Sequence, residues 1–354
     1  MSIAMRQLAK TCTMGVFALG LTVMSPRSVT AETLADALVG AYTHSGLLDQ
    51  NRALLRAADE DVARAVATLK PVLRWSTSLT QTFGQARTSA SSRNIDTDNL
   101  TAALNLAAEL VLYDFGARHL RVEAAKETVL ATREALVDIE QQVLFRAVSA
   151  YMGVLERSEF VALRQNNVRL LTQEMRAAQD RFEVGEVTRT DVALAQAQLA
   201  QARSGLAAAD GALVSAIEEY RNVVGRKPGN LRQPPSVPNV GSSVDKAKAI
   251  AVRRHPSLLA AQHQVAASDL LVRATSADMK PRISLTGRLG VTENLNNKEF
   301  NRGGSVGIEA GQTIYQGGAL SATNRQAKAR ADSQRGNLHV VRHNVQQNVG
   351  DAFA

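Results

Sequence analysis

Two histidines have the spacing of a metal site. His339 and His343 are four residues apart, so both imidazoles would lie on one face of a helix, where they could serve as two ligands of a metal ion. No Glu or Cys completes a ligand set with them, and Arg342 and Asn344 flank the second histidine. A solvated helix face is therefore the better interpretation, and we expect no metal site.

Glu109 and Glu309 are candidates for a carboxylate pair in general acid–base catalysis. Each lies on the polar side of an alternating segment, and Arg74 and Arg288 share those polar sides. This arrangement favours charge pairing over proton transfer. The sequence has neither a phosphate-binding glycine-rich loop with Lys and Ser/Thr nor a nucleophile elbow. We therefore predict that the protein is not an enzyme and uses no cofactor.

Four segments, 72–84, 100–112, 282–292 and 305–315, alternate apolar and polar residues with the two-residue period of a β-strand. Each has about the 9–11 residues that a tilted membrane strand needs, and apolar-out with polar-in is the pattern of membrane barrels. A soluble hairpin with one buried face is the alternative for either pair alone, and a one-residue slip would exchange the faces. The residues expected to face lipid are Leu73, Trp75, Leu79, Phe83, Leu104, Leu106 and Leu110. Those expected to face the lumen are Arg74, Glu109, Arg288 and Glu309.

The segment from Gly116 to Val224 lacks proline and predicts two long helices, 116–183 and 188–224. At about 1.5 Å per residue the first would be roughly 100 Å long, too long to be buried in a compact domain. Apolar residues recur at steps of three and four along both limbs, as in a coiled coil. These helices therefore predict a mainly α protein whose rods pack along other rods.

The organisation of the first half is repeated in the second. Residues 32–225 form the first repeat, 226–243 a Pro/Gly-rich linker, and 244–354 a second repeat with a helix at 244–278, two strands and a helix at 318–354. Tyr113-Asp114-Phe115-Gly116 corresponds to Tyr315-Gln316-Gly317-Gly318. The second repeat ends early, so we expect a C-terminally truncated copy of a longer protein. Four strands cannot close a barrel in lipid, whereas three chains would supply twelve.

The N-terminal residues 1–31 read as a secretory signal peptide. Arg6 and Lys10 precede an apolar stretch, and Val29-Thr30-Ala31 offers small residues for cleavage. The only cysteine, Cys12, would leave with this segment. The formal net charge is +8, but the basic residues are scattered, so we expect no nucleic-acid partner.

Residues 181–192, Arg-Phe-Glu-Val-Gly-Glu-Val-Thr-Arg-Thr-Asp-Val, resemble the helix-turn-helix tip of the TolC family of outer-membrane efflux proteins. The duplicated unit and the Leu-Tyr-Asp-Phe-Gly and Ile-Tyr-Gln-Gly-Gly strand ends extend that resemblance over residues 32–354. It implies a homotrimer in the outer membrane: a 12-stranded β-barrel above an α-barrel of long antiparallel coiled-coil helices in the periplasm.

The resemblance also implies function: a passive exit duct for type I secretion or tripartite efflux. Its partners would be outer-membrane lipid, a periplasmic adaptor and an inner-membrane transporter of ABC or RND type. By the same resemblance the adaptor would dock at the tip. Independently, Gly185 could supply a positive φ, and Thr190 or Asp191 could cap the returning helix. The docking and turn residues are Arg181, Phe182, Gly185, Val187, Thr190 and Asp191.

Two other functions remain open from the sequence. A soluble periplasmic coiled-coil scaffold or adaptor would explain the rods but not four alternating strands in matched pairs. A non-functional truncated duct copy is the second alternative, because the family's second tip, where the gate of the duct lies, would fall beyond Ala354.

Overall fold

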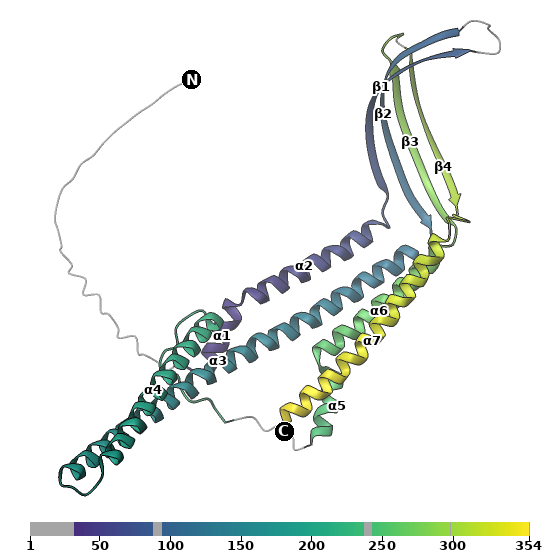
Figure 1. Ribbon diagram of the computed structural model, residues 1–354. Helices are drawn as coiled ribbons and strands as arrows, with labels where there is room; N and C mark the ends of the chain where they lie inside the picture. The colour runs from purple at the N-terminus through teal and green to yellow at the C-terminus, as the bar shows by residue number, and fades with distance from the viewer. Residues whose placement is uncertain (1–31, 88–93, 237–242, 298, 354) are drawn as a thin grey trace, which may run out of the picture.

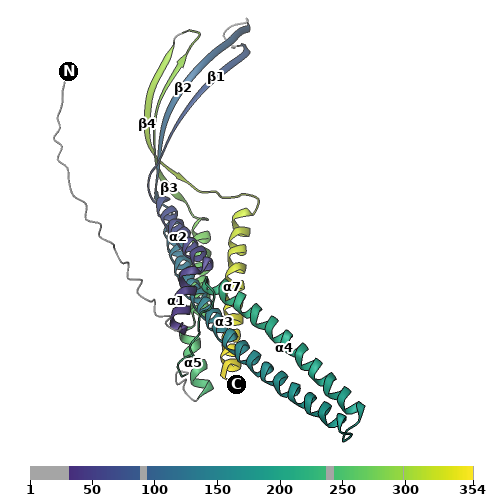
Figure 2. The ribbon, with the colours of Figure 1, turned by 90° about the vertical axis from the view of Figure 1, so that its left-hand side faces the viewer.

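The computed structural model describes residues 32–87, 94–236, 243–297 and 299–353. The predicted signal peptide, with Cys12, lies outside these ranges. The molecule is elongated: a four-stranded antiparallel sheet at one end continues into long helices that run to the other (Figures 1 and 2). The mainly helical fold with an antiparallel sheet, predicted from the two periodicities, is confirmed.

Two copies of one unit follow each other along the chain, each made of two short helices, a hairpin and a long helix. The first copy contains α1 (Leu34–His44), α2 (Gly46–Ala67), β1 (Val72–Arg87), β2 (Asn94–Tyr113) and α3 (Ala117–Glu183). The second contains α5 (Val244–Arg254), α6 (Pro256–Ala277), β3 (Arg282–Asn294), β4 (Phe300–Gly311) and α7 (Ala319–Phe353). The helix α4 (Arg189–Val224), which returns from the end of α3, has no counterpart among the described residues.

The two copies keep a constant numbering offset on each side of the hairpin. The helix α2 begins at residue 46 and α6 at residue 256, an offset of 210, whereas α3 begins at 117 and α7 at 319, an offset of 202. The strand registers agree with these offsets, because Val72 pairs with Glu109 and Arg282 pairs with Gly311. Equivalent positions can therefore be assigned residue by residue.

The helix expected over 244–278 is interrupted at His255, which ends α5 and precedes α6. Pro256 occupies the first turn of α6, where its missing N–H costs nothing. The residue before a proline is driven out of the helical region, and His255 has φ −69° and ψ 125°. The first copy has the same break, since α1 ends at His44 and Ser45 caps the start of α2.

The strands differ from their expected bounds at both ends of the sheet. Residues 85–87 and 94–99, which lie outside the expected strand bounds, extend β1 and β2, because the antiparallel ladder satisfies their backbone groups. The fourth strand covers 300–311 instead of 305–315. Its pairing with β3 ends at Gly311 opposite Arg282, so Gln312 to Tyr315 have no strand beside them in the single chain.

The long helix α3 is the axis of the helical part. It packs against α2 and α6 near the sheet and against α4 at the far end, and α6 in turn packs against α7 (Figure 1). A buried cluster lies where α1, α3 and α4 meet. Its buried members are Ala37, Ala150, Tyr151, Val154, Tyr220 and Val224. Small residues such as Ala37 and Ala150 let these helices approach closely.

The sheet has the strand order β1-β2-β3-β4, so β1 and β4 are its edges. No helix among the described residues is both long enough and apolar enough to cross a membrane.

Candidate functional site

The strand register divides the sheet into one apolar and one polar face. Leu106 of β2 stands between Trp75 of β1 and Leu289 of β3, and Leu289 is opposite Gly304 of β4. Since directly opposite residues point to the same side, all seven residues expected to face lipid share one face. Arg74, Glu109, Arg288 and Glu309 share the other.

The apolar face is uncovered in the single chain. Phe83 is 82% exposed, Trp75 69% and Val306 82%. A contiguous exposed apolar patch over four strands is unusual for a protein surrounded by water and marks a surface that contacts lipid or another protein. On the opposite face, Arg282 forms an ion pair with Glu109 at 3.9 Å.

A cavity of about 670 Å³ opens on the polar side where the sheet meets the helices. Charged side chains of both signs surround it, from both copies of the unit. These are Glu109, Asp114, Arg118, Arg121, Asp278, Lys280, Arg282, Arg288 and Glu309. Three of the four residues predicted to face the lumen thus meet at one place, while Arg74 lies beside a smaller neighbouring recess with Glu109 and Arg288.

Asp114 and Arg118 fix the connection between β2 and α3. The Arg118 Nε donates to Asp114 Oδ2 at 2.8 Å, and both side chains are largely buried. The same guanidinium also donates to the carbonyls of Thr68 and Val111, so it ties the end of α2 to the end of β2. Asp114 was expected only as part of a strand end and Arg118 was not singled out, since nothing in their spacing points to Thr68.

The Asp114 carboxylate is held in its charged form. Burial opposes its ionisation, but hydrogen bonds from the Arg118 side chain and backbone, the Arg118 charge and the Gly116 N–H outweigh burial, so the pKa of Asp114 lies below its ordinary value. Asp114 also accepts the N–H groups of Gly116 and Arg118 at 3.1 Å each, which caps the start of α3.

The far end of the molecule is a helical turn between α3 and α4. The Glu186 N–H donates to the Arg181 carbonyl at 2.9 Å and the Gly185 N–H to the Phe182 carbonyl at 3.0 Å, the two bonds of a Schellman motif. Gly185 has φ +81°, the positive value expected of it. Five of the six residues expected to dock an adaptor are exposed and Val187 is half-buried, and Val184, which the sequence did not single out, is 72% exposed.

The cap of α4 differs from the expectation of Thr190 or Asp191. Thr188 is the N-cap: its hydroxyl accepts the Asp191 N–H at 3.3 Å, and Asp191 Oδ2 accepts the Thr188 N–H at 2.8 Å. This reciprocal capping box requires a carboxylate three residues after the cap, so Asp191 is its second member and Thr190 takes no part. The hydrogen bonds from the Thr188 hydroxyl and N–H lower the pKa of Asp191.

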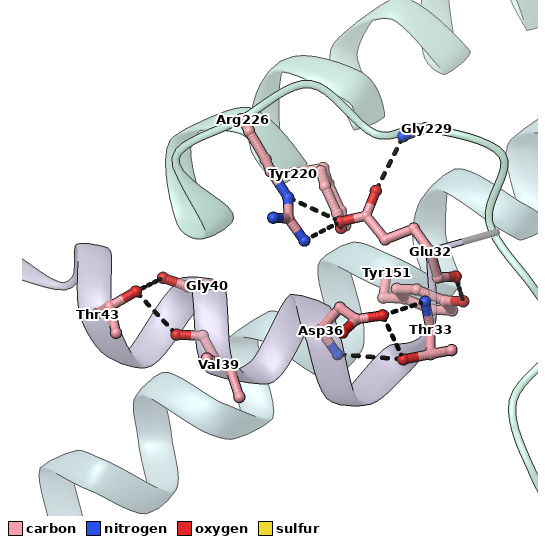
Figure 3. A network of polar contacts seen from close by, with 10 residues as sticks. All are labelled: Glu32, Thr33, Asp36, Val39, Gly40, Thr43, Tyr151, Tyr220, Arg226 and Gly229. Carbon is pink, nitrogen blue, oxygen red and sulfur yellow. Dashed lines mark hydrogen bonds and ion pairs between the residues drawn. The ribbon is translucent and has the colours of Figure 1, made fainter. Parts of the chain in front are cut away.

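Glu32 joins the start of the described chain to the segment after α4 (Figure 3). Its carboxylate accepts hydrogen bonds from the Tyr220 hydroxyl at 2.7 Å, from Arg226 and from the Gly229 N–H at 2.9 Å. Burial raises the pKa of Glu32, but these donors reverse the effect and the pKa lies below its ordinary value. No local pattern predicts this contact, because its partners are almost 200 residues apart in the sequence.

No three His, Cys, Asp or Glu side chains within the described ranges come together as a metal site would require. His339 and His343 are exposed on α7.

The family model described as "Outer membrane efflux protein" matches residues 41–226 and 249–354. Outer membrane efflux protein BepC of Brucella suis is 32% identical over 335 residues, which are 94% of this chain and 72% of BepC. Alkaline protease secretion protein AprF of Pseudomonas aeruginosa is 26% identical, over 67% of this chain and 50% of AprF.

The fold is also that of solved outer-membrane proteins. The crystal structure of the outer membrane protein VceC of Vibrio cholerae superposes with a TM-score of 0.76 at 19% identity, covering 90% of this chain and 77% of VceC.

Proposed function

Because the chain belongs to the outer membrane efflux protein family, we propose that it is an outer-membrane exit duct that oligomerises to close its barrel. The observation that carries this proposal is the sheet with one exposed apolar face, one polar face and two open edges. Open edges and unpaired backbone groups are not tolerated in lipid, so the strands of several chains must complete a barrel. Three chains supply twelve strands, an even number within the range of such barrels.

The apolar face would contact lipid and the polar face, with Arg74, Glu109, Arg288 and Glu309, would line the lumen. The helices would extend the lumen into the periplasm, because α3 continues from β2 without a domain boundary. Such a duct needs no cofactor and performs no reaction, and transport would be driven by an inner-membrane transporter. The names of the relatives, which include efflux and protease secretion, fit an exit duct for either kind of cargo.

The exposed tip between α3 and α4 is the part of the described chain furthest from the sheet (Figure 1). We assign to it the docking of a periplasmic adaptor, through Arg181, Phe182 and the neighbouring residues named above. Arg181→Glu should abolish export while the trimer still forms, because the Arg181 side chain is exposed at the tip. The same reversal at exposed Arg157, further up α3, should leave export intact, and equal losses in both variants would contradict the assignment.

The membrane location is tested by adjacent substitutions on opposite faces of β1. Leu79→Lys places a charge on the apolar face and should cost about 2–4 kcal/mol at the middle of a bilayer, whereas Ser78→Lys on the polar face should cost little. The measurements are fractionation with outer membranes and the amount of heat-labile trimer on gels. Recovery of the unaltered protein only as a soluble periplasmic monomer would contradict the duct and favour the scaffold.

A further inference from the structure

The polar face of the sheet carries its charges at one end, as far as its side chains are described. A row of residues opposite one another crosses all four strands at Ser76, Asn105, Gly290 and Gly303. From this row outward, the described positions on the polar face hold only Ser, Thr, Asn, Gly or Ala. Between the row and the helices, the same face carries Arg74, Glu109, Arg282, Arg288 and Glu309. The charges therefore lie at the base of the sheet, next to the helices.

Two of these arginines stand at the same level of the sheet. Arg74 of β1 is opposite Ala107 of β2, and Ala107 is opposite Arg288 of β3. The two arginine backbones are thus two strand spacings apart, about 10 Å, with only the methyl group of Ala107 between them. A recess of about 110 Å³ opens at this place, and both arginines line it. Two long cationic side chains can therefore reach one small ligand from opposite sides.

Neither arginine is neutralised by a neighbour. Within the described part of the chain, the side chains of Arg74 and Arg288 form no ion pair and no hydrogen bond. Glu109 lies two residues nearer the helices and pairs with Arg282 instead. Glu309 is opposite Ser284, which is four residues from Arg288 along β3, or about 13 Å. Since a guanidinium stays protonated in proteins, the recess has two permanent positive charges without a counter-ion.

The other charges at the junction of sheet and helices do not cancel this excess. The two acids on the helical side of the larger cavity have ion pairs of their own, Asp114 with Arg118 and Asp278 with Arg121. Lys280 lines the same cavity and adds a cation that contacts an aromatic ring rather than an acid. Unpaired positive charge therefore exceeds unpaired negative charge at this level of the molecule.

We propose that Arg74 and Arg288 form a binding site for carboxylate or phosphate groups at the base of the barrel, one site in each subunit. This inference rests on the proposed duct, in which the polar face lines the lumen. A guanidinium fork holds the oxygens of such groups with two parallel hydrogen bonds, and a ring of arginines in a pore favours anions. The sites of all subunits would lie at one level, where the anionic groups of a cargo are held as it enters the barrel.

Titration calorimetry of the detergent-solubilised trimer of the full-length chain tests the site, with inorganic pyrophosphate as the probe. Physiological salt is used, because it largely screens charges more than about 8 Å away. Arg74→Gln and Arg288→Gln should each raise the Kd for pyrophosphate about tenfold, since each removes charged hydrogen bonds. Both side chains are exposed, so the trimer should still form. Arg302→Gln is the matched control and should leave the Kd unchanged, because exposed Arg302 is opposite Val291 on the apolar face.

Two further variants separate a built site from a general positive field. Arg288→Lys keeps the charge but loses the planar fork, so it should weaken pyrophosphate binding, whereas a general field would be unchanged. Glu109→Gln removes the carboxylate that lines the recess together with both arginines, so it should strengthen binding. The opposite signs expected for these two variants cannot both arise from a loss of folding.

An intact outer-membrane trimer that binds no pyrophosphate would overturn the site and leave the duct standing. Equal Kd values for the Arg74→Gln, Arg288→Gln and Arg302→Gln variants, or unchanged binding in Arg288→Lys, would overturn it in the same way. Failure of the unaltered chain to form a trimer in outer membranes would overturn the duct and the site together.

Discussion

The two connections that lead from a strand pair into a long helix share one backbone path but differ in their side chains. Phe115 and Gly317 have φ values of 54° and 56°, and the glycines that follow, Gly116 and Gly318, both have 82°. Positive φ costs a residue with a Cβ about 1–2 kcal/mol, so glycine is expected at both positions and phenylalanine is the exception.

The exception is matched by contacts that only the first connection makes. The Phe115 ring lies 4.8 Å from the ring of Tyr113, and the Lys280 ammonium is 5.0 Å from its centre. Lys280 belongs to the second copy, so the first connection is completed by the chain itself. The second has Gly317 in place of Phe115, and its Tyr315 is 84% exposed in the single chain. The two connections therefore share their backbone conformation, and the first has a phenylalanine where Tyr113 and Lys280 contact its ring.

The two connections should differ most in stability when the residue that follows the tyrosine, Asp114 after Tyr113 or Gln316 after Tyr315, is replaced by Ala. Asp114→Ala leaves the Arg118 charge largely buried without its partner and should reduce the free energy of unfolding by about 3 kcal/mol. Gln316→Ala, at the equivalent exposed position, should change it by less than about 0.5 kcal/mol. Chemical denaturation in detergent, followed by circular dichroism, measures both. Equal losses would show that Asp114 and Arg118 do not distinguish the connections.

A smaller effect is expected from pH, because a protonated Asp114 can keep part of its hydrogen bonding. Its folded pKa is lowered, so its contribution to stability is present above the ordinary pKa of about 3.9 and is lost as pH falls through the folded pKa. Asp114→Asn should therefore be less stable than the unaltered protein at neutral pH and approach it in acid. The change in stability caused by Gln316→Asn should not vary with pH. If the change caused by Asp114→Asn were also the same at every pH, the lowered pKa of Asp114 would not contribute to stability.

The smallest effects are expected at the residue with positive φ. Gly317→Ala should cost about 1–2 kcal/mol from backbone strain alone, since an added Cβ at this position meets no atom within 4 Å. Phe115→Gly removes a similar strain but also removes the contacts with Tyr113 and Lys280, so its net effect should be nearer zero. Thermal unfolding of the two variants compares them, and a larger loss for Phe115→Gly would show that the ring contacts outweigh the strain.

Much of the fold could be predicted because it rests on periodicity and repetition. Alternation located all four strands and assigned their faces, and the three-and-four spacing located α3 and α4 within one residue. The errors occurred where local signals were weak. The polar residues at 94–99 do not resemble a strand, yet pairing with β1 makes them one. The break at His255 could have been read from Pro256 alone.

The contacts within the candidate site could be predicted less well. The helical turn at Gly185 follows from local sequence, whereas the choice of Thr188 as the cap depends on where α4 begins. The bonds of Arg118 to Thr68 and of Glu32 to Tyr220 join residues far apart in sequence, and no periodic pattern encodes such pairs.

The hairpin formed by β1 and β2 is longer than the one formed by β3 and β4, since Asn94 to Asn99 continue β2 past Thr101, where pairing with Asn294 begins. The far part of the longer hairpin bends away from the line of the sheet (Figure 1). In a closed ring of chains, long and short hairpins would therefore alternate around the mouth of the barrel. An antibody raised against the far part of the long hairpin would recognise only the first half of each subunit, although the barrel itself is built from both halves alike.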